Sequence, residues 1–146
     1  MGILLITADS NGQGIPSGWQ PGMKITMTYG GGMRPFSDTV FISDAVCYYS
    51  ASDEGKLTRF EFTLTQKELD GLALFLRQQK FDKIRDGAKP TFTYDKGSTS
   101  ILLQWADHIV GAGTSASLEL EDKQKANFDA VRIYLDELVA THSKNK

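Results

Sequence analysis

The chain contains a single cysteine, Cys47, among its 146 residues. One thiol cannot form an intramolecular disulfide, and a cysteine-rich zinc site needs several thiolates. Because Cys47 lies within the apolar run 45–49, we expect it to be a small buried hydrophobic residue. The lack of disulfides suits a reducing compartment, although a secreted domain of this length can also fold without them.

Histidine is also scarce, since His108 and His142 are the only two and stand far apart in the sequence. A metal centre needs several ligands that converge, and neither histidine belongs to a His-x-x-x-His pair. No Gly-x-Ser-x-Gly motif, typical of a serine hydrolase, is present either. We therefore predict no metal, no cofactor and no catalytic residue, and we expect the protein not to be an enzyme.

The chain also lacks a large excess of either charge and has no long hydrophobic run. The formal net charge is −2, with acidic and basic residues interleaved, so we expect no binding to nucleic acid. The apolar run at residues 3–6 is too short for a signal peptide or a membrane span. A cytoplasmic location is our default expectation. A secreted or periplasmic location stays open if a signal peptide has been removed.

What the sequence does contain is a pattern of strands that lead into helices. Alternating apolar and polar residues predict strands at 24–29, 39–43, 45–50, 57–64, 91–94, 99–106 and 115–120. Residues 108–110 are expected to extend the strand 99–106 past a kink, and the glycines within 111–113 to form the next turn. Residues 53–56 have the composition of a hairpin turn.

Two amphipathic helices are predicted to follow these strands. Thr65 and Glu68 match a capping box, and the second helix is expected to have Asp122 as its N-cap. Helical spacing relates the apolar residues of each segment, which are Leu69, Leu72, Ala73 and Leu76 in the first and Phe128, Val131, Leu135 and Leu138 in the second.

Together these elements predict an α+β fold: a mostly antiparallel sheet of about five to seven strands with two main helices on one face. A single domain is expected at 24–142. Before it we expect a flexible N-terminal arm, 1–23, with a short strand at 3–8 and with Trp19 contacting the domain. After it we expect a frayed tail, 143–146.

One segment, 30–36, is not explained by this scaffold. Its three glycines are not followed by the Gly-Lys-Ser/Thr of a phosphate-binding loop, and they do not open a helix. A protruding loop with a soft apolar tip and one cation suits a protein partner. We therefore predict that partner binding involves Gly30, Gly31, Gly32, Met33, Arg34 and Phe36.

Two segments stand out in the order of the elements: Tyr29-Gly30-Gly31-Gly32-Met33 and the helix start Leu64-Thr65-Gln66-Lys67-Glu68-Leu69-Asp70-Gly71-Leu72. In these segments and in the order of its elements, the chain resembles emfourin-like proteins, small bacterial inhibitors of thermolysin-type metallopeptidases. Where the family usually has Ser-Gly-Gly-Phe, this chain has Tyr29-Gly30-Gly31-Gly32. The resemblance implies the shared architecture and a peptidase as the partner.

We therefore expect a non-enzymatic binding module, with peptidase inhibition through the segment 30–36 as its most concrete form. A first alternative is a small-molecule or enzymatic pocket between sheet and helices. Its expected lining is Phe92, Tyr94, Trp105, Tyr48 and Tyr49, with Asp107 and His108 at the rim. A second alternative is an accessory subunit that pairs with another chain through a sheet edge.

Overall fold

The computed structural model of the chain describes residues 14–31, 36–84, 89–90, 97–114, 118–119 and 122–143. Its elements are, in order, β1 (Lys24–Gly31), β2 (Phe36–Ser43), β3 (Cys47–Asp53), β4 (Lys56–Phe62), α2 (Gln66–Gln78), the 3₁₀ helix η1 (Phe81–Lys83), β5 (Lys89–Pro90), β6 (Gly97–Trp105), β7 (His108–Thr114), β8 (Leu118–Glu119) and α3 (Asp122–Ser143).

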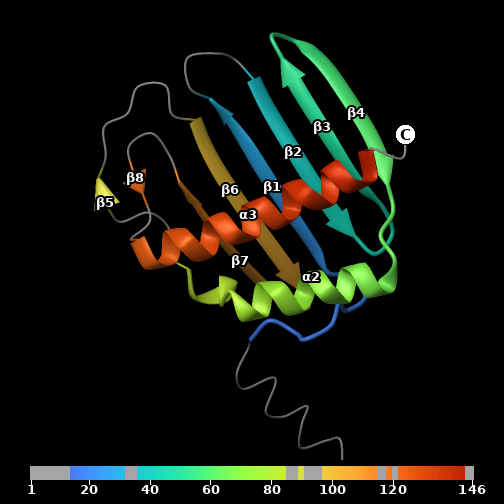
Figure 1. Cartoon of the computed structure of the whole chain (residues 1–146), viewed down its shortest axis with the longest axis vertical. Helices are drawn as coiled ribbons and strands as arrows, with labels where there is room; N and C mark the ends of the chain where they lie inside the picture. Colours follow the sequence, from blue (N-terminus) through green and yellow to red (C-terminus); the bar gives the residue numbers. More distant parts are fainter. Residues whose placement is uncertain are drawn as a thin grey trace, which may run out of the picture.

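Six of the strands form one antiparallel sheet in the order β4-β3-β2-β1-β6-β7. Strands β5 and β8 pair with each other in a small second sheet. Figure 1 shows α3 running obliquely across the strands of the large sheet, with α2 beside it near one end of the strands. The predicted α+β fold, an antiparallel sheet with two helices, is confirmed.

The hairpin between β3 and β4 has the turn that its sequence predicts. Asp53 pairs with Lys56, which leaves Glu54 and Gly55 as a two-residue connection. Both have positive φ, 53° and 86°, as a type I′ turn requires. Glycine adopts this backbone without a steric penalty, so Gly55 sets the tight reversal.

The prediction for residues 108–113 is wrong. Trp105 pairs directly with His108, so the chain reverses within two residues, with Ala106 in the left-handed region at φ 49°. Residues 108–110 therefore begin a separate antiparallel strand, β7, which includes Gly111 and Gly113. A Cβ on Gly113 would lie 2.7 Å from the Thr99 carbonyl oxygen, so this glycine permits close strand approach rather than a turn.

The start of α2 confirms the predicted capping box. The Thr65 hydroxyl accepts a hydrogen bond from the Glu68 N–H at 3.1 Å, and the Glu68 carboxylate accepts one from the Thr65 N–H at 2.9 Å. The predicted apolar stripe is buried against the sheet and comprises Leu69, Leu72, Ala73 and Leu76. Capping and burial together fix where this helix begins and which face it turns inward.

Helix α3 packs into the same core through Phe128, Val131 and Leu135, while Leu138 is half-buried beside them. It also contacts α2 directly. The rings of Phe75 and Tyr134 stack with centroids 4.5 Å apart, and His142 Nε2 lies 2.9 Å from the Glu68 carboxylate. The end of α3 is therefore attached to the capping box that begins α2.

Residues 14–23, which we expected to belong to an N-terminal arm, contribute Ile15, Trp19 and Met23 to the core. The main-chain N–H of Trp19 donates to the Asp70 carboxylate at 2.8 Å, and the Arg77 guanidinium donates to the Ile15 carbonyl at 2.8 Å. This segment is thus bonded to α2 by main-chain groups as well as by its apolar side chains. The remainder of the expected arm, 1–13 with the strand 3–8, lies outside the described residues.

Candidate functional site

The helix-covered face of the sheet becomes polar toward one end of its central strands. Antiparallel register places one inward residue from β2, β1 and β6 side by side in each row across the sheet. The three rows are Ile42-Ile25-Leu103, Val40-Met27-Ile101 and Asp38-Tyr29-Thr99. We call the last of these the polar row. The first two rows are buried and apolar, whereas Tyr29 in the polar row is 39% exposed.

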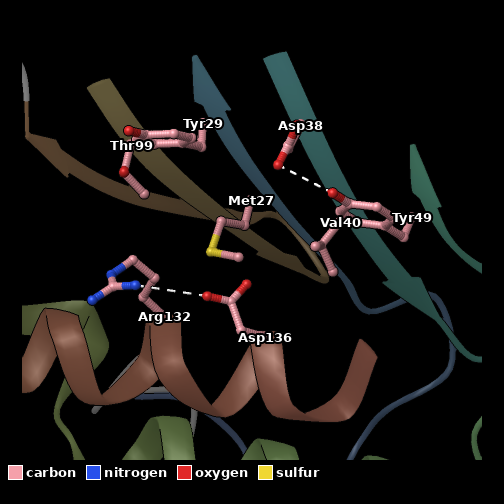
Figure 2. A pocket seen from close by; sticks show the side chains of 8 residues that line it. All are labelled: Met27, Tyr29, Asp38, Val40, Tyr49, Thr99, Arg132 and Asp136. Atoms are coloured by element: carbon pink, nitrogen blue, oxygen red, sulfur yellow. Dashed lines mark hydrogen bonds and ion pairs between the residues drawn. The ribbon is translucent and has the colours of Figure 1, made fainter. Parts of the chain in front are cut away.

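A pocket of about 440 Å³ lies between the polar row and α3. Its volume falls within the range of small-molecule sites. Figure 2 shows Met27 at its centre, the polar row and Tyr49 on the sheet side, and two α3 side chains facing them. The lining residues are Met27, Tyr29, Asp38, Val40, Tyr49, Thr99, Arg132 and Asp136. We call this site the α3 pocket.

The α3 side of the pocket is formed by two residues that the helical repeat places on one face. Val131 and Leu135 are one turn apart and buried in the core. Arg132 and Asp136 each follow one of them, so they share the adjacent face of the helix and reach the pocket. The Arg132 Nη1 lies 3.6 Å from the Asp136 carboxylate. The core stripe of α3 therefore places a cation and an anion at the pocket wall.

A carboxylate and a phenol meet on the sheet side. The Tyr49 hydroxyl donates a hydrogen bond to Asp38 Oδ2 at 3.1 Å. Burial, and then the Asp38 charge, raise the pKa of the Tyr49 hydroxyl. Tyr49 thus remains protonated near neutral pH and continues to donate to Asp38.

The pKa of the Asp136 carboxylate on α3 is also changed by its surroundings in the pocket. Partial burial is the main cause that raises the pKa of Asp136, although its side chain remains 56% exposed; Arg132 lowers this pKa, and Asp38 raises it further. Two carboxylates from different elements, Asp38 of β2 and Asp136 of α3, therefore act on each other across the pocket.

Thr99 completes the polar row. It is 7% exposed, yet within the described residues its hydroxyl makes no hydrogen bond to another side chain. Because the residue lines the pocket, its hydroxyl is available to a bound molecule as a donor or an acceptor.

The residues that we predicted to bind a partner lie partly within the described chain. We predicted that the strand 24–29 ends before Gly30, but Gly30 and Gly31 are the last two residues of β1, and Gly30 pairs with Ser37 and Ser98. Phe36 begins β2. Gly32, Met33 and Arg34 lie outside the described residues. Tyr29 and Asp38 of the α3 pocket thus lie directly beside the strand ends that this segment joins.

The alternative pocket that we expected is divided between different places. Tyr49 lines the α3 pocket, but Tyr48 lies on the opposite face of the sheet, where it stacks on Phe41 with ring centroids 5.3 Å apart. A second, more open cavity of about 420 Å³ is lined by Asp82, Lys83, Trp105, Asp107, His108, Ile109 and Val110. Phe92 and Tyr94 lie outside the described residues.

The remaining reactive groups lie away from the α3 pocket. Cys47 is fully buried, as predicted, and burial raises the pKa of its thiol. His142 is bonded to Glu68, and His108 lies against Trp105 with ring centroids 5.1 Å apart. Within the described ranges, no three His, Cys, Asp or Glu side chains gather closely enough to hold a metal ion.

The sequence did not identify Tyr29, Asp38, Thr99, Arg132 or Asp136 as site residues. A signal was present, because Asp38 and Thr99 continue the inward alternation of two apolar strands with polar side chains. That signal becomes specific only when the register places these residues beside Tyr29. Arg132 and Asp136 also look like solvent-exposed helix residues until the packing of α3 is known.

Neither a scan of protein-family models nor a search of curated proteins finds a match to this chain. The resemblance to emfourin-like proteins therefore stays a prediction. Among the described helices, none combines the length and the apolar character that crossing a membrane requires.

Proposed function

We propose that this chain is a non-enzymatic binding protein and that the α3 pocket is its ligand site. The observation that carries this proposal is the polar row, in which Asp38, Tyr29 and Thr99 replace core residues at the same level of three adjacent strands. A row with only a scaffold role would be filled with apolar side chains, as the other two rows are. Convergent polar groups in a mostly preformed hollow are typical of ligand sites.

A binding role is favoured over catalysis by the state of the lining side chains. Tyr49 has a raised pKa, which does not suit a nucleophile or base at neutral pH. Arg132 is turned toward carboxylates of its own helix. What the pocket offers is therefore hydrogen bonding, charge and aromatic surface in fixed positions, which serve recognition.

Nuclear magnetic resonance with small-molecule mixtures tests this proposal. Compounds of positive, neutral and negative charge should include binders that shift the resonances of Tyr29, Thr99 and Asp136. Thr99→Phe, which places a ring in the pocket, should abolish those shifts. Ser98→Phe adds the same ring on the opposite face of the sheet and should preserve them. Shifts that survive Thr99→Phe, or no pocket shifts at all, would contradict the proposal.

The segment 30–36 supports a second candidate, in which the partner is a protein. Strands β1 and β2 pair as far as Gly30 and Ser37, and both lie inside the sheet rather than at its edge. Residues 32–35 therefore join two strands that are held on both sides. In its most concrete form, suggested by the resemblance, this partner is a thermolysin-type metallopeptidase.

Peptidase assays separate the two candidates. Addition of the chain to a thermolysin-type peptidase should slow peptide hydrolysis, and the double variant Arg34→Ala and Phe36→Ala should weaken this inhibition. Thr99→Phe serves as the control, because it alters the pocket and leaves both of these side chains in place. Equal inhibition by the unchanged chain and the double variant would remove the segment 30–36 from this role.

A further inference from the structure

Building on the proposed pocket, we infer that its ligand is a small organic cation, namely a protonated amine or a guanidinium group carried on an apolar body. The inference rests on the charges that the pocket leaves uncompensated, on its aromatic and sulfur surface, and on a hydroxyl without a described partner.

The charges of the lining favour a cation. Its described side chains include the carboxylates of Asp38 and Asp136 and the guanidinium of Arg132, which leaves one negative charge in excess. Arg132 is shared between two carboxylates of its own helix, at 3.8 Å from Asp129 and 3.6 Å from Asp136. A ligand anion would have to displace both.

Asp38 is the carboxylate that remains. Its hydrogen-bond partner is the neutral Tyr49 hydroxyl, and it has no ion pair within the described part of the chain. Among the described lining residues the only cation is Arg132, which is paired with carboxylates of its own helix. An ammonium or guanidinium group placed between Asp38 and Asp136 would supply the missing countercharge to both.

The titration behaviour of Asp136 agrees with this assignment. Partial burial raises the pKa of Asp136, Arg132 lowers it, and the Asp38 charge raises it further, so the neighbouring carboxylate disfavours the ionised form of Asp136. A cation bound beside Asp136 would have the opposite effect and favour its ionised form.

The uncharged part of the lining suits the body of such a ligand. Tyr29 and Tyr49 offer aromatic rings, on which cations bind favourably, and Met27 offers a polarisable thioether between them. The Thr99 hydroxyl can accept a hydrogen bond from an N–H of the ligand. An apolar or aromatic molecule with one cationic end therefore matches the pocket along its length.

Three compounds with nearly the same carbon body test the inference on the full chain: 2-phenylethylamine, 2-phenylethanol and phenylacetate. Titration followed by nuclear magnetic resonance should show the amine shifting Tyr29, Tyr49 and Thr99, with an affinity at least about tenfold above that of the alcohol and the acid. Asp38→Asn should reduce amine affinity by about tenfold or more and alcohol affinity by less than about twofold. Asp44→Asn makes the same substitution just beyond the other end of β2 and should have no effect.

The outcomes distinguish this inference from the proposed function. If the alcohol or the acid binds in the pocket as tightly as the amine, the ligand is not a cation, although the pocket remains a binding site. If Asp38→Asn leaves amine binding unchanged, the inference is also overturned; Asp136→Asn repeats the test should Asp38→Asn unfold the chain. If no compound shifts pocket resonances at about 10 mM, both the inference and the proposed function fail.

Discussion

The two ends of the sheet–helix interface have the same backbone and opposite side-chain chemistry. At the α2 end, Ile25 and Leu103 are paired neighbours with at most 1% exposure. Four residues further along each strand, the paired residues Tyr29 and Thr99 occupy the same inward face at the other end, next to a hollow of about 440 Å³. The ladder is continuous, so the difference lies entirely in the side chains.

The two ends therefore differ in role: the side chains of the α2 end stabilise the fold, whereas those of the pocket end are presented to the pocket. Apolar side chains in close contact supply most of the free energy of folding, and the α2 end contains them. Polar side chains beside a hollow contribute little and carry a solvation cost. The pocket end is therefore expected to tolerate substitution in stability assays and to be sensitive in binding assays.

The largest effect is expected at the α2 end. Leu103→Ala removes a fully buried side chain and should lower the free energy of unfolding by about 2–5 kcal/mol in urea denaturation. Thr99→Val, on the same strand, keeps the side-chain shape and removes a hydroxyl without a described partner, so the expected change is below about 1 kcal/mol. Equal losses for the two variants would mean that Thr99 belongs to the scaffold.

The same division explains how much of the structure could be predicted from the sequence. The α2 helix was predictable because Thr65, Glu68 and Leu72 are local signals, three or four residues apart, that all favour one structure. The β3–β4 turn was predictable for the same reason. Residues 108–113 were misread because the turn at Ala106 has no glycine, while Gly113 serves close strand approach.

The candidate site could not be predicted in this way because it depends on contacts between distant segments. Asp38, Thr99 and Asp136 come from β2, β6 and α3, and each has an ordinary surface interpretation in its own segment. Only the β1–β2 and β1–β6 registers place the first two beside Tyr29. Sequence periodicity gives the inward face of a strand but does not show which strands are neighbours.

A smaller effect is expected where α2 begins. Thr65→Ala removes the hydroxyl that accepts from the Glu68 N–H and should cost about 1 kcal/mol of unfolding free energy. Thr63→Ala, two residues earlier on an exposed position, is the matched control and should change stability by less than about 0.5 kcal/mol. A Thr65→Ala chain as stable as the control would show that packing alone holds the start of the helix.

The next prediction concerns pH at the same cap. The Thr65 N–H, and then His142, hold the pKa of Glu68 below its ordinary value of 4.5. When folding lowers the pKa of a carboxyl, the group stabilises the fold at any pH above its unfolded-state pKa. This stabilisation is lost as the pH falls through the folded-state pKa. Glu68→Gln should therefore flatten the decline of the urea midpoint below about pH 4.5. Glu61→Gln controls for the loss of one negative charge, and an unaltered slope in Glu68→Gln would contradict the prediction.

The smallest effect on stability, and one of opposite sign, is expected from Asp136 in the pocket. Burial raises the pKa of this carboxyl, so the folded chain binds its proton more tightly than the unfolded chain does. Its contribution to stability therefore falls as pH rises from the ordinary value of 3.8 through the raised one. Because the side chain is 56% exposed, solvent screens this cost, and Asp136→Asn should leave stability at pH 7 unchanged or raise it by less than about 0.5 kcal/mol.

Glu137→Gln, on the next residue of α3, is the matched control for Asp136→Asn in thermal and urea unfolding. A loss of more than about 1 kcal/mol in Asp136→Asn alone would mean that the ion pair with Arg132 stabilises the fold. A neutral or stabilising result would mean that the chain retains a carboxylate which folding does not need. Combined with a loss of amine binding in the same variant, that result would identify the pocket end as the part of the interface whose side chains serve a ligand.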